Sequence, residues 1–156
     1  MTGQLLIGGL FISIAVIIQA TAFEFLTRSL LLLVPKWLKI NRSYAPTVII
    51  VFAVLCIFAI HTVQIWVWTA GYIVLGEFDA LRTALYFSTV TFTSLGYGDI
   101  TLSEHWRLLS SIEAVNGILM FGWSTAYIYR LMTYVWQRDA KRWKKFMIDE
   151  QSGDKE

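Results

Sequence analysis

The sequence T-F-T-S-L-G-Y-G-D-I, from Thr91 to Ile100, decides the fold and is called the glycine-rich stretch below. Gly96 and Gly98 flank Tyr97 in it. Glycine has no β-carbon, so glycines at alternate positions allow an extended path of alternating hand that other residues resist. On such a path successive carbonyl groups can point to one side. The stretch therefore predicts a row of backbone oxygens suited to coordinating a cation.

A short apolar run precedes the glycine-rich stretch. Residues 81–92 are moderately apolar but too few to cross a membrane, which takes about 20 helical residues. Glu77 and Asp79 lie just before the run, where a helix macrodipole favours negative charge. We expect a re-entrant helix that enters the membrane and turns back. Non-helical backbone at that depth must line a cavity or be buried in protein, so the re-entrant helix implies an aqueous path.

Three longer segments have the length of membrane spans. The first runs from about Leu5 to Leu26, the second from Thr47 to Val74, and the third from Arg107 to Gln137. A cleaved signal peptide would begin with positive charge, whereas residues 1–4 contain no lysine or arginine. We therefore expect the first span to be retained.

The composition favours a membrane protein that is not an enzyme. The chain of 156 residues is 56% hydrophobic and 15% charged, whereas soluble domains are about 45 to 50% apolar and about a quarter charged. Once three spans are subtracted, too few residues remain for a separate soluble domain. Cys56 is the single cysteine, which excludes a disulfide framework, and no metal-ligand cluster or nucleophile-base spacing is present in the sequence.

Basic and aromatic residues follow the first and third spans. Residues 30–38 are typical of an interfacial segment broken at Pro35, with Trp37 among the basic residues Lys36, Lys39 and Arg42. Residues 138–147 alternate basic and aromatic residues in a similar way, and we expect residues 149–156 to be frayed.

The charges predict an orientation in the membrane. Most lysines and arginines lie after the first span and in the tail, whereas Arg82 and Arg107 are the only ones around the glycine-rich stretch. Positive charge collects on the cytoplasmic side, so we expect the N-terminus outside, the C-terminus in the cytoplasm, and the glycine-rich stretch opening outward. The small size favours a prokaryotic plasma membrane.

The chain resembles the pore module of potassium channels. The filter of that family usually reads T-V-G-Y-G-D, and its places are taken here, after Thr93, by Ser94, Leu95, Gly96, Tyr97, Gly98 and Asp99. The resemblance covers residues 47–134. It implies an all-α membrane protein with the potassium-channel pore fold over residues 47–137. An extra N-terminal transmembrane helix with a basic cytoplasmic linker takes up residues 1–46, and a basic cytoplasmic tail takes up residues 138–156.

The resemblance implies a homotetramer that conducts potassium ions passively. Backbone carbonyls from Ser94 to Gly98 would line the path, and the Ser94 hydroxyl would add the innermost ring. Asp99 would concentrate cations at the outer mouth. Ser94 replaces the common threonine and lacks its methyl group, so we expect a looser innermost site but preserved potassium selectivity.

The resemblance also implies how the filter is supported. Tyr97 is expected to point away from the path and to pack on Tyr86 and Phe87, with Thr93 preceding the filter. In some family members a glutamate on the pore helix pairs with the aspartate after the filter. Val90 takes that position here, so the outer brace must come from elsewhere.

The third span carries the hinge and cavity candidates. In the family a glycine about twenty residues past the filter acts as a hinge, and Gly117 and Gly122 are the candidates. Two interpretations stay open for both: a hinge, or close contact between helices, which small residues allow in membranes. The positions that match the family's cavity and gate are Ile118, Phe121 and Thr125, with Asn116 as the alternative if the register differs by one residue.

Three titratable residues are candidate modulators. Ionisable groups inside spans are costly, so Glu113 and His61 carry functional hypotheses. Glu113 is either a hydrogen-bond anchor to the pore helix or part of a cation-attracting ring. His61 is either a satisfied interhelical hydrogen-bonding group or a sensor. His105, close to the mouth, is either an external proton sensor or an ordinary surface histidine.

Potassium ions are the transported species that the resemblance implies, and the expected partners are further copies of the chain and membrane lipids, with no nucleic acid or soluble substrate. The basic tail either binds anionic lipid or simply fixes the topology after the last span. Two other functions stay open. One is a weakly selective cation channel, since Ser94 relaxes the innermost ring, and the other is a non-conducting regulatory subunit of a longer channel.

Overall fold

The computed structural model describes the backbone of residues 2–40 and 44–153 and the side chains of residues 2–32 and 44–137. Four helices make up the described chain: α1 (Thr2–Ile40), α2 (Ala45–Val74), α3 (Leu81–Phe92) and α4 (Arg107–Gly153). No strand occurs within these ranges. The all-α prediction is confirmed. Side chains of the predicted basic linker (residues 33–43) and basic tail (residues 138–156) lie outside the described residues.

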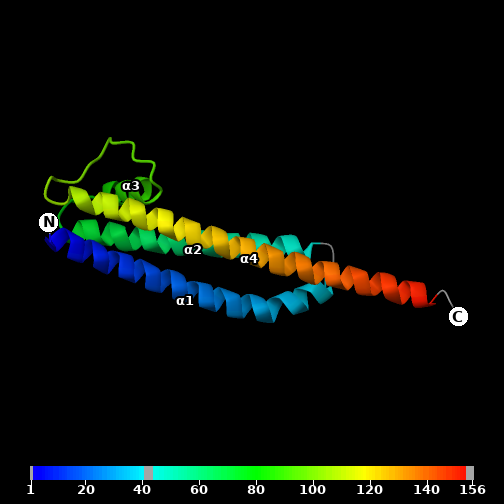
Figure 1. Ribbon diagram of the computed structural model, residues 1–156. Coiled ribbons are helices and arrows are strands. Elements are labelled where there is room, and N and C mark those ends of the chain that lie inside the picture. Colours follow the sequence, from blue (N-terminus) through cyan, green and yellow to red (C-terminus); the bar gives the residue numbers. More distant parts are fainter. Residues whose placement is uncertain (1, 41–43, 154–156) are drawn as a thin grey trace.

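Three long helices, α1, α2 and α4, run side by side, and α3 lies with the loop of residues 93–106 at one end of them (Figure 1). The N-terminus lies at that same end and the C-terminus at the opposite one (Figure 1). Helix α3 packs on α2 and α4, and α1 packs on the same two helices. The bounds of α3 are those predicted for the short re-entrant helix.

Two segments among the described residues are long and apolar enough to cross a membrane, Thr2–Leu32 and Ala45–Val74. The predicted third span, in α4, is not one of them. The reason lies in the buried side of α4, which carries the polar residues Glu113, Asn116 and Ser124. Because polar groups in spans turn toward the protein interior, the lower hydropathy of α4 reflects its packing against α1, α2 and α3.

Helices α1 and α4 extend beyond the predicted spans. Helix α1 continues to Ile40, so the predicted break at Pro35 is wrong. The helix changes direction near its C-terminal end instead (Figure 1), and a proline inside a helix can kink it without ending it. Helix α4 passes the predicted end of the span at Gln137 and continues to Gly153.

Two apolar clusters with a polar layer between them hold the bundle together. The cluster near α3 contains Trp68, Tyr72, Phe87, Phe92, Leu102, Leu109 and Met120. The other cluster contains Phe23, Leu26, Leu30, Ala45, Ile49, Ala53, Ile57, Leu131 and Val135. Between them, buried polar side chains from all three long helices meet at one level: Gln19, His61, Gln64 and Ser124.

The side chains of this polar layer satisfy one another. Gln64 Nε2 donates to Gln19 Oε1 at 2.9 Å, and Gln19 Nε2 donates to Ser124 Oγ at 2.9 Å. His61 Nε2 lies 2.9 Å from Ser124 Oγ, and His61 Nδ1 lies 3.3 Å from Gln64 Oε1. Polar side chains can bind helices together where no water is present to satisfy them. His61 thus has the geometry of a satisfied interhelical group, while its role as a sensor stays a hypothesis.

Replacing Gln64 with leucine should destabilise the bundle, because Gln19 and His61 each lose a partner and each unsatisfied buried polar group costs about 1–3 kcal/mol. We expect the melting temperature of the purified protein to fall by at least about 3 °C. The control is Val63→Leu, at a side chain that is 51% exposed on the same helix. Equal melting temperatures for the two variants would contradict this role of the polar layer.

Candidate functional site

The backbone of the glycine-rich stretch alternates in hand. The φ angle is positive at Ser94 (58°), Gly96 (54°) and Gly98 (75°), and it is not positive at Leu95 or Tyr97 between them. Glycine tolerates this region freely, whereas another residue there costs about 1–2 kcal/mol. The alternation of φ predicted from the two glycines is therefore present, and it begins two residues before Gly96, at Ser94.

The C-terminal end of α3 supports the start of this path. The Val90 carbonyl accepts hydrogen bonds from the backbone nitrogens of Leu95 at 3.0 Å and Gly96 at 3.3 Å. Thr93 Oγ1 donates to the carbonyl of Thr89 at 2.7 Å. The last carbonyls of a helix lack intrahelical partners, and these bonds satisfy two of them. The support at Val90 thus comes from its backbone.

Tyr86 braces the outer end of the stretch. Its hydroxyl donates to Asp99 Oδ2 at 2.8 Å, and the Ile100 nitrogen donates to Asp99 Oδ1 at 3.1 Å. Tyr86 therefore supplies the outer brace that the valine at position 90 cannot.

Tyr97 does not make the predicted contact with Phe87 within the described chain. The Tyr97 side chain is 65% exposed, and Leu95 is 59% exposed. The Phe87 ring packs instead on Tyr72 of α2 and on Phe78 of the segment between α2 and α3, with centroid distances of 5.2 Å each. Two large apolar side chains thus point outward from alternate positions of the stretch, and a single chain leaves them uncovered.

A concavity of about 300 Å³ lies between the glycine-rich stretch, α3 and the first turns of α4. Its lining includes Ser94, Gly96 and Gly98, the positions of positive φ, but neither Leu95 nor Tyr97. The remaining lining residues are Phe87, Thr91, Ile100, Thr101, Leu102, Arg107, Ser110, Ser111 and Ala114. The stretch therefore has an apolar projecting side and a hollow side.

Two contacts tie down the loop that follows the stretch. Glu77 accepts hydrogen bonds from the backbone nitrogen and the hydroxyl of Ser103, both at 2.7 Å. Gln4 Nε2 donates to the carbonyl of His105, which joins the start of α1 to the loop. The exposed His105 ring lies edge-on to Trp106, with centroids 4.9 Å apart. Its role as a proton sensor stays a hypothesis.

Glu113 joins three helices from a fully buried position on α4. Its Oε2 accepts from the Tyr72 hydroxyl of α2 at 2.6 Å, and its Oε1 accepts from the Ser88 hydroxyl of α3 at 2.5 Å. The carboxyl group is 0% exposed, so it has no surface on which to attract cations. This is the geometry of an anchor to α3, and it argues against a cation-attracting ring at Glu113.

Gly117 brings α4 into backbone contact with α3. A β-carbon at Gly117 would lie 1.9 Å from the Phe92 carbonyl oxygen, whereas one at Gly122 would meet no atom within 4 Å. Close contact between helices is thus present at Gly117 and absent at Gly122 within the described chain. A hinge at either glycine stays a hypothesis.

The exposed side of α4 carries the three cavity candidates Ile118, Phe121 and Thr125. Ile118 is 59% exposed and Phe121 is 36% exposed, and Thr125 is exposed as well. Asn116 is fully buried, and its amide has no hydrogen-bond partner among the described residues. Asn116 therefore faces the interior of the chain, which argues against the alternative register.

Several structural residues were not predicted from the sequence. Tyr72 and Ser88 hold Glu113, and Gln19, Gln64 and Ser124 complete the polar layer. Each lies in an apolar or moderately apolar segment, and a polar side chain in such a segment is the signal that would have found them. Which of them pair depends on how the helices pack.

A family model described as "Ion channel" matches residues 47–134. The match covers α2, α3, the glycine-rich stretch and the adjoining part of α4, and it leaves α1 outside. Together with the helical architecture, it confirms the predicted pore fold of outer helix, re-entrant helix, filter and inner helix, preceded by one further helix. No curated protein and no solved structure matches the chain.

Removal of the Glu113 side chain should loosen α3 from α4. In Glu113→Ala the Tyr72 hydroxyl loses its acceptor, at about 1–3 kcal/mol, and the Ser88 hydroxyl keeps only the Ile65 carbonyl at 3.1 Å. We expect the melting temperature to fall most in this variant. Glu113→Gln keeps one acceptor oxygen, so its melting temperature should lie between those of Glu113→Ala and the native protein. The matched control is Glu104→Ala, at an exposed residue. If both alanine variants melt alike, Glu113 is not an anchor.

Adding a methyl group at Gly117 should also destabilise the protein. The clash in Gly117→Ala is with a backbone carbonyl, which cannot rotate away, and overpacking costs about 1–3 kcal/mol. Gly122→Ala meets open space and should melt like the native chain. Thermal unfolding of both purified variants tests this. A Gly117→Ala protein as stable as Gly122→Ala would show that α4 readily moves away from Phe92.

Proposed function

Because the chain belongs to the ion channel family, with the pore module of potassium channels over residues 47–134, we propose that it forms a homotetrameric channel that conducts potassium ions selectively and passively. The observation that carries this proposal is the alternating backbone at Ser94, Gly96 and Gly98, next to the end of α3. In this proposal residues 47–137 form the pore domain, residues 1–46 a peripheral span with its linker, and residues 138–156 a cytoplasmic tail.

The chemistry follows from dehydration of the ion. A potassium ion that crosses lipid must exchange its water ligands for equivalent ones, and rings of backbone carbonyls supply them. The carbonyls from Ser94 to Gly98 would form these rings, and the Ser94 hydroxyl would form the innermost one. The C-terminus of α3, where the macrodipole is negative, favours a cation nearby. Asp99, held by Tyr86, would attract cations to the outer mouth.

The two sides of the glycine-rich stretch support assembly into a ring. Leu95 and Tyr97 project from one side, and the concavity of about 300 Å³ lies on the other. If the projecting side of one copy packs in the concavity of the next, the two copies contact each other through different surfaces. Contacts of this head-to-tail kind form a closed ring when the rotation between neighbouring copies divides a full turn. Four copies give the number of strands that potassium filters use. The exposed side of α4, with Ile118 and Phe121, would then face the central cavity.

We propose that the channel lies in a prokaryotic plasma membrane, with the N-terminus outside and the C-terminus in the cytoplasm. Two helices have the length and composition of spans, which supports a membrane location for a protein of this family. The distribution of lysine and arginine favours a cytoplasmic tail. The N-terminus and the loop of residues 93–106 share one end of the bundle (Figure 1), so this orientation opens the filter outward.

Potassium flux into liposomes that hold the purified full chain tests the proposal, with barium as the blocker. Gly96→Ala should reduce the flux by about tenfold or more, because each of four copies pays about 1–2 kcal/mol for a positive φ. Gly76→Ala is the matched control, since Gly76 has a φ of 76° and equally open surroundings but lies in the turn before α3. It should leave the flux unchanged.

The alternatives give different results in the same preparation. A reversal potential that barely changes when sodium replaces potassium would indicate a weakly selective cation channel. No flux from a purified and correctly folded tetramer would overturn the proposal in favour of a regulatory subunit. Equal flux in Gly96→Ala and Gly76→Ala would show that the glycine-rich stretch does not line the path.

A further inference from the structure

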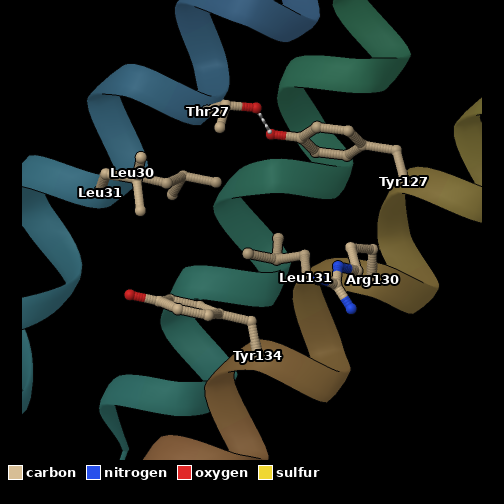
Figure 2. Close-up of a pocket in the computed structure, with 7 residues that line it drawn as sticks. All are labelled: Thr27, Leu30, Leu31, Tyr127, Arg130, Leu131 and Tyr134. Atoms are coloured by element: carbon tan, nitrogen blue, oxygen red, sulfur yellow. Dashed lines mark hydrogen bonds between the residues drawn. The ribbon is translucent and has the colours of Figure 1, made fainter.

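A cleft of about 180 Å³ separates α1 from α4 in the half of the bundle that lies away from α3. Figure 2 shows side chains of the two helices facing each other across it. Helix α1 contributes Thr27, Leu30 and Leu31, and α4 contributes Tyr127, Arg130, Leu131 and Tyr134. In Figure 1, α1 diverges from α4 over this part of the bundle.

The cleft has a closed end and an apolar floor. The hydroxyls of Thr27 and Tyr127 are hydrogen-bonded at 3.0 Å, which joins the two helices at one end of the cleft (Figure 2). Leu30 and Leu131 are buried and form its floor, whereas Leu31 is 52% exposed at its rim. A flexible hydrocarbon chain fits such a site better than a polar molecule does.

One lining residue adds a charge. Arg130 is exposed, and the single ion pair between described residues joins Arg28 to Glu24 on α1. The Arg130 guanidinium therefore has no carboxylate partner in the described part of the chain. Guanidinium groups bind phosphate through paired, charge-assisted hydrogen bonds. The chemistry of the cleft thus suits a molecule with an anionic head and an apolar body.

The position of the cleft along the helices points to the same ligand. The first charged residues of α1 are Glu24 and Arg28, and Arg130 is the first charged residue of α4 after Glu113. Charged residues on both helices begin at this level, as they do where a span leaves the hydrocarbon for the headgroup layer. In the proposed orientation this is the cytoplasmic leaflet, which is rich in anionic lipid.

We propose that the cleft between α1 and α4 binds an anionic phospholipid, with an acyl segment against Leu31 and Leu131 and the phosphate at Arg130. This inference rests on the proposed orientation, and it assigns a role to α1, which lies outside the family match. The bound lipid bridges α1 to the inner helix α4. The bound lipid favours one distance between α1 and α4. Because α4 lines the proposed pore, lipid binding thereby affects the position of the pore-lining helix.

Native mass spectrometry of the detergent-purified full chain tests the proposal, because it counts bound lipids without requiring conduction. The probes are phosphatidylglycerol and phosphatidylcholine with identical acyl chains. Arg130→Gln should weaken phosphatidylglycerol binding by about fivefold. Leu31→Trp should reduce it at least as much by filling the cleft. The controls are Arg28→Gln, at a paired arginine of the same level, and Leu32→Trp, at a neighbour that is 71% exposed and does not line the cleft.

Binding that is equal in the native chain, Arg130→Gln and Leu31→Trp would overturn the proposal. Equal binding of both lipids, with loss only in Leu31→Trp, would also overturn it, since the cleft would then hold an acyl chain without selecting an anion. Displacement of phosphatidylglycerol by inorganic phosphate alone would identify a free anion as the ligand. Failure of potassium flux leaves this assay unaffected, so the two proposals fail separately.

Discussion

The hydrocarbon of a membrane offers no hydrogen bonds, and this constraint explains where the polar residues of the chain lie. Gln19, Gln64 and Ser124 lie in apolar or mixed helices, and each is paired with another polar group across a helix boundary. Glu113 lies closer to α3 and is satisfied in the same way, since each of its carboxyl oxygens accepts a hydrogen bond from a hydroxyl group. The helices are therefore held in register by pairing requirements as well as by the two apolar clusters.

The packing of the helices fixes the position of the glycine-rich stretch. Helix α3 is fixed to α4 by Glu113 on one turn and by backbone contact at Gly117 on the next, so the end of α3 has little freedom. The stretch starts from that end through the Val90 carbonyl, and Tyr86 of the same helix holds Asp99 at the far end. A strained serine is tolerated at position 94 because its neighbours on both sides are fixed.

Features encoded locally were predictable, and features created by packing were not. The bounds of α3 and the alternating path at Gly96 and Gly98 follow from run length and from glycine stereochemistry. Within one chain the Phe87 ring packs on Tyr72 and Phe78 instead of on Tyr97, and nothing in the sequence states which way a helix is rotated. The break predicted at Pro35 failed because proline bends a helix as readily as it ends one. The partners of Glu113 and His61 come from three helices, so only their arrangement in space reveals them.

The modest hydropathy of α4 has a consequence for biosynthesis. Apolar residues favour insertion of a segment into the bilayer, and α1 and α2 are apolar enough to cross a membrane whereas α4 is less apolar. The groups that neutralise its polar side, such as Tyr72 and Gln19, reside on the two helices made earlier. We therefore expect α4 to insert after α1 and α2, with its polar side packed on helices already in the bilayer.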